Sequence, residues 1–380
     1  MNENILILGC KNYPAFSSPI VISGGMEVYV WELVKHLKDV FEFTIIAGHS
    51  KSDDESIKVI SVPIFGGLAW QPISLVFFSF FICLGLIIRR KEINLINAQT
   101  PLSGLISYVF KKLFGIPYIV SIHSFGSTKE HLGRFAGIYG VIEKLVLNNA
   151  DKVICAGYKQ QQLLTSQYKL HSDHFVVIHP GMDQVKNDKV AVDDTLKKVL
   201  DDGSFKMLFL GRLVDENGLM DLLEVVKYLR DKPVKLLIAG NGNLEAAIRE
   251  YIQKEQLQDK VKLLGVVRDK NKIALLQNVN LAVRLSYHEV FPVAYLEAIT
   301  FGLPVVATPV GDTEYLAEMT NAISIVPLKD SRKAAEIIEG IIMADGLPSE
   351  VIKKCEAFIQ GINWKTQAEK TACMFNWILK

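Results

Sequence analysis

Two glutamates, Glu289 and Glu297, lie in a stretch whose residue types could hold a phosphorylated sugar. The stretch reads Ser-Tyr-His-Glu-Val-Phe-Pro-Val-Ala-Tyr-Leu-Glu-Ala over residues 286–298. Pro292 is expected at the first helical position, where a missing N–H costs nothing. Free N–H groups and the dipole favour an anion at such a helix start. One carboxylate precedes this start and the other lies about 7 Å along the helix, and both are acceptors suited to hydroxyls. The pattern predicts a site for a sugar diphosphate.

Other motifs occur along the chain in a recognisable order. A buried strand at 5–9 leads toward Gly-Gly-Met-Glu at 24–27, and Leu-Phe-Leu-Gly-Arg-Leu follows at 208–213. Ile-Ala-Gly-Asn-Gly lies at 238–242, and Val-Lys-Leu-Leu-Gly at 261–265. Together with the glutamate stretch, these motifs resemble the retaining GT-B glycosyltransferases, in particular their family 4, also called glycosyl transferases group 1.

The resemblance implies an α/β protein with the GT-B fold, in which two Rossmann-like, doubly wound domains face each other across a cleft. Residues 1–180 would form an acceptor-binding domain, which a C-terminal helix over 364–380 rejoins. Residues 181–363 would form the domain that binds a nucleotide-sugar donor. The residues themselves agree, because strand-like apolar runs alternate with helical stretches, which is typical of parallel sheets covered by helices.

Thirteen strands are predicted from these apolar runs. Seven precede a polar linker that follows His179, at 5–9, 43–47, 58–62, 95–98, 118–122, 152–156 and 175–178. Six follow the linker, at 206–211, 235–240, 261–264, 281–283, 304–307 and 323–325. Ligands of such sheets bind beyond the carboxyl ends of the strands.

The resemblance also assigns roles to single residues. The catalytic candidates are His123, which would contact the transferred sugar, Arg212, which would neutralise the diphosphate, and Glu289. The donor-binding candidates are Gly24, Gly25, Arg212, Asn217, Gly265, Val266, Glu289, Phe291, Val293 and Glu297. Some of these candidates have an ordinary alternative: a surface salt bridge for Arg212, a structural role for His123 and a simple turn before a helix from Met26 to Leu37 for the glycine pair.

Two positions depart from the family pattern. The family usually has Glu-Lys-Gly where this chain has Glu216-Asn217-Gly218, so a cation is missing. Asp312 stands where a second glycine is usual. Two other cations could take the lysine's place, although surface roles are expected for both: Arg284 and Lys272. Glu27 and His288 are weaker candidates for lining the site.

Composition excludes several classes of protein. The net charge of +1 argues against a nucleic-acid binder that works through a general positive field. The five scattered cysteines indicate reduced thiols in a cytoplasmic setting. The first residues lack a secretion signal. There is no Asp-x-Asp motif or histidine pair at helical spacing, so no metal site is predicted, although Mg²⁺ could replace the lost lysine.

Residues 73–88 are apolar on every side and precede Arg-Arg-Lys at 89–91. As a helix these 16 residues reach roughly 24 Å, short of the ~30 Å hydrocarbon core, so a membrane span is the least favoured interpretation. A buried core helix is favoured. The third interpretation is a partly exposed helix that contacts a membrane, where the cations at 89–91, Lys111 and Lys112 would attract anionic headgroups.

The leading hypothesis is a retaining transferase that moves a hexose from a nucleotide-diphosphate sugar to a glycan or lipid-linked acceptor. No cofactor is required beyond the donor, for which a UDP-sugar is favoured over a GDP-sugar. The alternatives are a catalytically weakened donor-binding subunit that acts with a partner enzyme, and a GT-B sugar-nucleotide epimerase. The first would gain turnover on restoring lysine at 217, and the second would act without an acceptor.

Overall fold

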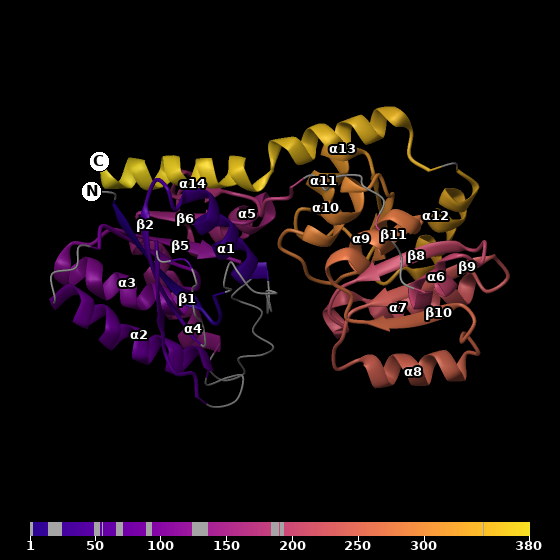
Figure 1. The fold of residues 1–380 in the computed structure, drawn as a ribbon, viewed down its shortest axis with the longest axis horizontal. Helices are drawn as coiled ribbons and strands as arrows, with labels where there is room; N and C mark the ends of the chain where they lie inside the picture. The colour runs from indigo at the N-terminus through magenta and orange to yellow at the C-terminus, as the bar shows by residue number, and fades with distance from the viewer. Residues whose placement is uncertain are drawn as a thin grey trace. The chain divides into compact units, whose positions relative to one another are not determined.

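The structure is a computed structural model that describes residues 3–13, 25–48, 54, 56–65, 71–88, 93–123, 136–183, 190, 194–344 and 346–380. The chain divides into two compact units (Figure 1). The first comprises Met1–Gly181 together with Trp364–Lys380, and the second comprises Met182–Asn363. These limits differ by one residue from the expected boundary after residue 180.

The first unit contains a seven-stranded sheet in the order β3-β2-β1-β4-β5-β6-β7, and its neighbouring strands are parallel. The strands are β1 (Asn4–Cys10), β2 (Glu42–Ala47), β3 (Ile57–Ser61), β4 (Leu95–Ala98), β5 (Tyr118–Ile122), β6 (Lys152–Cys155) and β7 (Phe175–Val177). The strand order changes direction between β1 and β4. Such a switch point is where open α/β sheets bind ligands.

Helices cover both faces of this sheet. One face packs against α2 (Gln71–Ile88), α3 (Pro101–Phe114), α4 (Ala136–Asn149) and α5 (Tyr158–Tyr168). The other face packs against α1 (Gly25–Leu37) and the C-terminal α14 (Trp364–Leu379). A short 3₁₀ helix, η3 (Ser172–His174), precedes β7. Phe375 of α14 is fully buried among strand residues such as Ile5 and Ile7, so the last helix completes the core of the first unit.

The local sequence explains where α3 begins and ends. Thr100 is the N-cap, and its side chain accepts a hydrogen bond from the Ser103 N–H while Ser103 bonds back to the Thr100 N–H. This reciprocal pair satisfies two N–H groups that the first turn leaves open. Pro101 occupies the first helical position, where it fits. At the other end, Gly115 adopts a left-handed φ of 71° and its N–H donates to the Lys111 carbonyl, which closes the last turn.

Helix α2 packs one face and exposes the other, so the expectation of a core helix is wrong. Its buried residues are Leu75, Ser79, Cys83 and Leu86. Phe77 and Phe81 are 56% and 55% exposed. Their spacing of four places them on one side of the helix. Within the described part of the chain, α2 is the one helix long and apolar enough to cross a membrane by length and composition.

The second unit contains a six-stranded parallel sheet in the order β10-β9-β8-β11-β12-β13. The strands are β8 (Phe205–Leu210), β9 (Val234–Ala239), β10 (Val261–Gly265), β11 (Leu281–Arg284), β12 (Val305–Ala307) and β13 (Ile323–Ile325). The order switches between β8 and β11. All thirteen predicted strands therefore occur, with ends within one residue of those expected.

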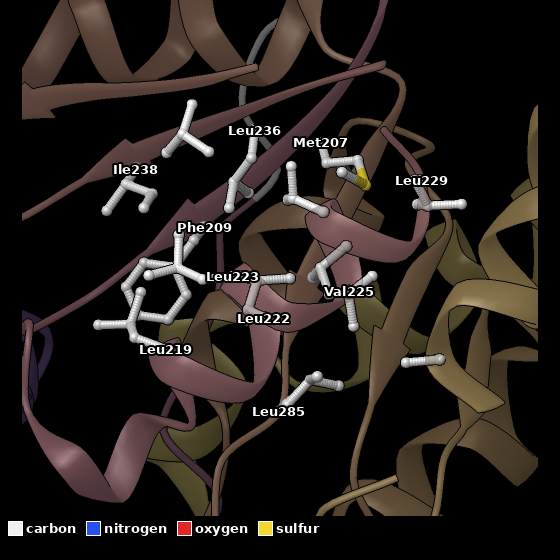
Figure 2. Close-up of a cluster of buried hydrophobic side chains, with 14 of the residues drawn as sticks. Met207, Phe209, Leu219, Leu222, Leu223, Val225, Leu229, Leu236, Ile238 and Leu285 are labelled. Atoms are coloured by element: carbon white, nitrogen blue, oxygen red, sulfur yellow. The ribbon is translucent and has the colours of Figure 1, made fainter. Parts of the chain in front are cut away.

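The helices of the second unit are α6 (Asp194–Leu200), α7 (Leu219–Tyr228), α8 (Glu245–Lys254), α9 (Asp269–Asn278), α10 (Val293–Thr300), α11 (Thr313–Thr320), α12 (Ser331–Met343) and α13 (Ser349–Gly361), with the 3₁₀ helix η4 (Asp215–Asn217). Figure 2 shows the core beneath α7, where Leu222 and Leu223 meet Phe209 and Ile238 of the sheet. The fold class predicted from the sequence is confirmed as two Rossmann-like domains.

Candidate active site

Polar side chains of the second unit gather beyond the carboxyl ends of β8 and β11, at the switch point of the sheet. Arg212 and Asn217 follow β8, whereas Arg284 ends β11 and Glu289 lies in the loop after it. Because β8 and β11 are neighbours, residues about 70 positions apart in the sequence meet here. The sequence-based hypothesis placed the donor site at this edge.

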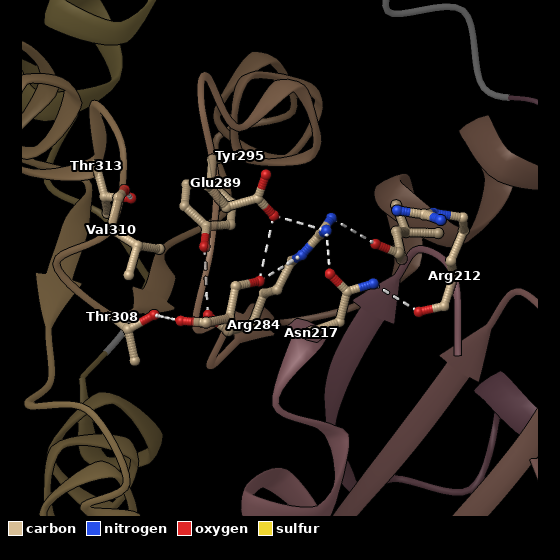
Figure 3. Close-up of polar contacts among 10 residues, drawn as sticks. Arg212, Asn217, Arg284, Glu289, Tyr295, Thr308, Val310 and Thr313 are labelled. Atoms are coloured by element: carbon tan, nitrogen blue, oxygen red, sulfur yellow. Dashed lines mark hydrogen bonds and ion pairs between the residues drawn. The ribbon is translucent and has the colours of Figure 1, made fainter. Parts of the chain in front are cut away.

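Arg284 joins the two loops (Figure 3). Its Nη2 lies 2.6 Å from Glu289 Oε1 in an ion pair and donates to Asn217 Oδ1 over 2.7 Å. Its Nε donates to Ser286 Oγ over 2.9 Å, and its Nη1 to the Leu210 carbonyl over 3.4 Å. The side chain is only 17% exposed. The expected surface role of Arg284 is therefore wrong, because a guanidinium at the end of a central strand is enclosed by the loops on either side.

Asn217 is buried at the end of η4 and uses both ends of its amide. Its Nδ2 donates to the Arg212 carbonyl over 2.6 Å, while its Oδ1 accepts from Arg284. The amide therefore fixes the backbone at Arg212 and orients the guanidinium of Arg284. An ammonium at position 217 would instead face Arg284 as a like charge.

The Glu289 loop is held from beneath by Gly311 and Asp312. Gly311 has a φ of +53°, and a Cβ there would overlap the carbonyls of Glu289 and Val290. The Asp312 N–H donates to the Val290 carbonyl over 3.2 Å, with a φ of −86° that any residue adopts. The geometry thus requires glycine at 311 and not at 312. The departure at Asp312 leaves the loop intact.

The start of α10 differs in detail from the expectation. The helix begins at Val293, and Pro292 has a ψ of 85°, so it is the N-cap and not the first helical residue. The Val293 N–H donates to the Phe291 carbonyl, and the Tyr295 N–H to the Pro292 carbonyl. Within the described residues this leaves the Ala294 N–H open in the first turn, so the helix start offers fewer free amides than predicted.

Glu297 lies on α10, as predicted, and forms an ion pair with Lys272 of α9, with 2.7 Å between Lys272 Nζ and Glu297 Oε1. Both side chains are partly exposed. Lys272 is therefore committed to the more distant glutamate and is not the cation beside Asn217. This partly exposed ion pair fits the surface role expected for Lys272 better than a replacement of the missing lysine.

The other site candidates of the second unit lie in the loops after β8, β10 and β11 and at the start of α10. Arg212 and His288 are exposed, and the Arg212 guanidinium makes no ion pair or hydrogen bond with the described residues. Phe291 is buried and Val293 partly buried. Gly265 ends β10, and Val266 follows it, 50% exposed. The Gly265 carbonyl accepts from the N–H of Gly240, where a Cβ would overlap the Gly211 carbonyl, so the Gly-x-Gly turn packs against the strand end that carries Arg212.

In the first unit, His123 follows β5 and lies beside two residues that the sequence analysis did not identify. Its Nε2 donates to Gln99 Oε1 over 2.8 Å, and its ring centroid lies 4.8 Å from that of Tyr29. Desolvation lowers the pKa of His123 to about 4, so the imidazole is neutral near pH 7. With Nε2 protonated, Nδ1 can accept a hydrogen bond. Gln99 follows β4. A polar side chain directly after a buried strand is the sequence feature that could have identified it as a site residue.

The glycine pair gives a mixed result. Gly24 lies outside the described residues. Gly25 is the first residue of α1, one position earlier than the expected helix start, and a Cβ there would meet nothing within 4 Å.

Glu27 is buried on α1, and burial of the Cys10 thiol, together with the charge of Glu27, raises the pKa of that thiol. Among the described residues, no group of three or more His, Cys, Asp or Glu side chains could hold a metal ion.

Comparison with known proteins places both units in one family. A family model described as glycosyl transferases group 1 matches residues 193–360, and one described as glycosyltransferase family 4 matches residues 23–185. An uncharacterised glycosyltransferase of Methanocaldococcus jannaschii is 23% identical over 76% of this chain and 76% of its own length. The D-inositol 3-phosphate glycosyltransferase of Pseudarthrobacter chlorophenolicus is 26% identical over 59% of this chain, and the match spans 57% of that protein.

Solved structures share the fold. Anabaena HepE in complex with UDP-glucose gives a TM-score of 0.75 at 19% identity, with 98% of this chain and 99% of that chain covered. Sucrose-phosphate synthase from Thermosynechococcus elongatus gives 0.77 at 20% identity, with 99% of both chains covered. The two family models together with this fold show that the chain belongs to the family 4, group 1 glycosyltransferases and has the GT-B fold.

Proposed function

We propose that the protein is a retaining glycosyltransferase that moves a hexose from UDP-hexose to a glycan or lipid-linked acceptor. The observation that carries this is the cluster at the switch point of the second sheet, where Arg284 links Glu289 to Asn217. A UDP-sugar is favoured because HepE binds UDP-glucose and shares the fold. The second unit would bind the donor and the first the acceptor.

The mechanism follows from the charges that must be stabilised. Breaking the bond between the anomeric carbon and the diphosphate develops negative charge on the leaving phosphate. The exposed guanidinium of Arg212 and the open Ala294 N–H would meet that charge. Glu289 would bind sugar hydroxyls and Glu297 the ribose. The acceptor would attack from the leaving-group face, with a phosphate oxygen taking its proton, and this retains the anomeric configuration.

His123 would contact the transferred sugar as a neutral hydrogen-bond partner. Its pKa of about 4 makes it a poor acid at neutral pH, because it carries its second proton only in acid. Its protonated Nε2 is engaged by Gln99. The remaining Nδ1 can orient a hydroxyl. The role is therefore positioning and not proton transfer.

A catalytically weakened donor-binding subunit that acts with a partner enzyme is the main alternative, motivated by Asn217 and Asp312. Contacts at both positions favour the transferase. Asn217 bonds to two site residues, and Asp312 leaves the Glu289 loop supported. Epimerisation of the sugar nucleotide would differ by giving a new sugar nucleotide without any acceptor.

The test is a thermal-stability titration of the full chain with UDP-, GDP-, ADP- and dTDP-hexoses. Ligand at a hundred times its dissociation constant adds about 2.7 kcal/mol to the free energy of unfolding. We expect UDP-hexose to stabilise the wild type and not Arg212→Ala. A matched control is Arg249→Ala, which removes an exposed arginine of α8 that pairs with Glu245. No stabilisation by any sugar nucleotide would contradict the proposal, and NMR of the product's anomeric proton tests retention.

We further propose that the first unit rests on a membrane from the cytoplasmic side, where its free cysteines remain reduced. Helices α2, α3 and α4 cover one face of its sheet. Each exposes large apolar side chains, namely Phe77 and Phe81 on α2, Leu113 and Phe114 on α3, and Ile138 and Val141 on α4. Soluble surfaces carry such residues singly, whereas gathered ones mark an interaction site.

Cations accompany this apolar surface. Lys112 on α3 and Lys144 on α4 are exposed. Lys111 is not free for headgroups, because its Nζ lies 2.7 Å from Asp151 Oδ1. The cations at 89–91 lie outside the described residues. Exposed lysines next to an apolar face fit an anionic bilayer.

Sedimentation with phosphatidylglycerol vesicles tests the membrane contact. Phe77→Ser/Phe81→Ser should release the protein from vesicles, whereas Met343→Ser, at a 90% exposed site of the second unit, should not. Equal binding by the two variants, or no binding by the wild type, would contradict this contact. Donor binding should be unchanged in both variants.

A further inference from the structure

The cluster around Arg284 raises the question of what neutralises the second charge of a diphosphate in a chain that has asparagine at 217. Resting on the proposed function, we propose that Arg284 supplies this second cation from β11, and that Asn217 orients it. The charge would thus have moved from the β8 loop to the neighbouring strand. Arg284 is then a donor-binding residue in addition to Arg212.

The Arg284 guanidinium lies next to the position where the family carries its second cation. Arg284 Nη2 lies 2.7 Å from Asn217 Oδ1, so the positive charge sits next to the side chain that stands where the family carries lysine. The strand pairing explains the proximity, because β11 and β8 are adjacent and parallel. A positive charge can therefore reach the same site from the loop after β8, where the family carries a lysine, or from β11, where this chain carries Arg284.

Arg284 keeps an N–H group that no described residue uses and that a ligand could accept from. A guanidinium has five N–H groups. Within the described residues, Ser286, Leu210 and Asn217 accept hydrogen bonds from three of them, and Glu289 forms an ion pair with Nη2. The second N–H of Nη1 is left, and Nη1 lies 3.2 Å from the position that a Cβ on Gly211 would occupy. It therefore lies against the backbone that carries Arg212, at the edge expected to receive the diphosphate.

A lysine at 217 and the arginine at 284 would be incompatible, because both carry a positive charge. A lysine at 217 would bring its ammonium beside Arg284, and two cations at that separation repel strongly when partly buried. An asparagine there removes the repulsion and accepts a hydrogen bond from the arginine. Glu289 balances the guanidinium in the free protein. Arg284 and Asn217 are therefore interpreted as one compensating pair and not as a lost site.

The experiment measures dissociation constants of UDP and of uridine by calorimetry, with the full chain. Arg284→Met keeps an unbranched apolar stem and removes the charged guanidinium. We expect UDP to bind at least tenfold more weakly and uridine to bind as in the wild type. The matched control is Arg249→Met on the exposed surface of α8. A purely structural role would weaken UDP and uridine equally, and that result would overturn the proposal.

Relocating the charge is the sharper test. Asn217→Lys alone should lower thermal stability, because two cations then meet. In the double variant, Asn217→Lys/Arg284→Met, UDP affinity should return to within about threefold of the wild type. If the double variant binds UDP no better than Arg284→Met, the proposal is overturned. Should Arg284→Met not fold, Arg284→Lys keeps a cation on β11 and should still bind UDP more tightly than Arg284→Gln.

These outcomes separate the proposal from the function on which it rests. If the wild type binds none of UDP, GDP, ADP and dTDP, the donor site itself is wrong. If the wild type binds UDP and Arg284→Met binds it equally well, the donor site stands and the role of Arg284 is wrong.

Discussion

The strands β4 and β11 occupy the same place in their sheets, each next to the first strand of its unit, yet their carboxyl ends differ. Gln99 follows β4 and bonds to a neutral histidine. Arg284 ends β11 and forms an ion pair with Glu289. One edge therefore presents neutral hydrogen-bonding groups and the other presents charges. Under the proposed function, two units of the same architecture would bind different ligands, an uncharged hydroxyl in the first and a diphosphate in the second.

The largest effect should come from removing charge at the second edge. Glu289→Gln leaves a side chain of the same shape but breaks the ion pair with Arg284 and weakens hydrogen bonds to the sugar. Hydrogen bonds to charged groups contribute about 1.5–3 kcal/mol, so we expect UDP-hexose affinity to fall about 10- to 150-fold. Calorimetry should show a much smaller loss for UDP alone. Glu245→Gln on α8 is the control, and an equal loss for both ligands would contradict a contact with the sugar.

A smaller effect is expected from the support beneath that edge. Gly311→Ala would place a Cβ against the carbonyls of Glu289 and Val290 and strain a left-handed backbone, which costs about 1–3 kcal/mol of stability. Gly302→Ala is the matched control, because its φ is +70° but the nearest atom lies at 3.9 Å. Urea unfolding should show the larger loss for Gly311→Ala. Equal losses would mean that strain alone, and not the close approach to the Glu289 loop, sets the cost.

The smallest effect concerns the neutral edge of the first unit. The pKa of His123 is lowered to about 4 in the folded chain, from an ordinary value of 6.5. The unfolded chain therefore binds more protons between these values, and stability falls as the pH drops from about 6.5 toward 4. By pH 5 the free energy of unfolding should have fallen by about 1–2 kcal/mol. His123→Gln should lose less stability than the wild type between pH 7 and pH 5, and identical urea curves would contradict the lowered pKa.

The strands could be predicted from the sequence because buried parallel strands read as continuous apolar runs. The positions of Glu289 and Glu297 also followed, since one precedes a helix and the other lies on it. Arg284 was misjudged because its enclosure depends on β8 and β11 lying side by side, a contact that one sequence does not reveal. Pro292 was placed one residue too far into α10, since helix ends depend on local backbone angles.

The exposed face of α2 was also misjudged, for a different reason. A helix that is apolar all round gives no periodic signal, so the sequence does not say which side is covered. The structure supplies that information through α3, whose Phe110 stacks on Phe80 with ring centroids 5.5 Å apart. Departures from a family motif, such as Asn217, were visible in the sequence, and Arg284 was one of two cations considered for the missing lysine, but the contact between Arg284 and Asn217 was not predictable.

The return of α14 to the first unit has a consequence for how the protein is made. Residues 182–363 are continuous, so the second unit can fold once they have left the ribosome. The first unit cannot, because Ala368, Met374 and Phe375 complete its core and are synthesised after the second unit. The unit that is begun earlier is thus completed later, and part of one face of its sheet stays uncovered while the second unit is made. A chain that stops before Trp364 should leave the first unit aggregation-prone.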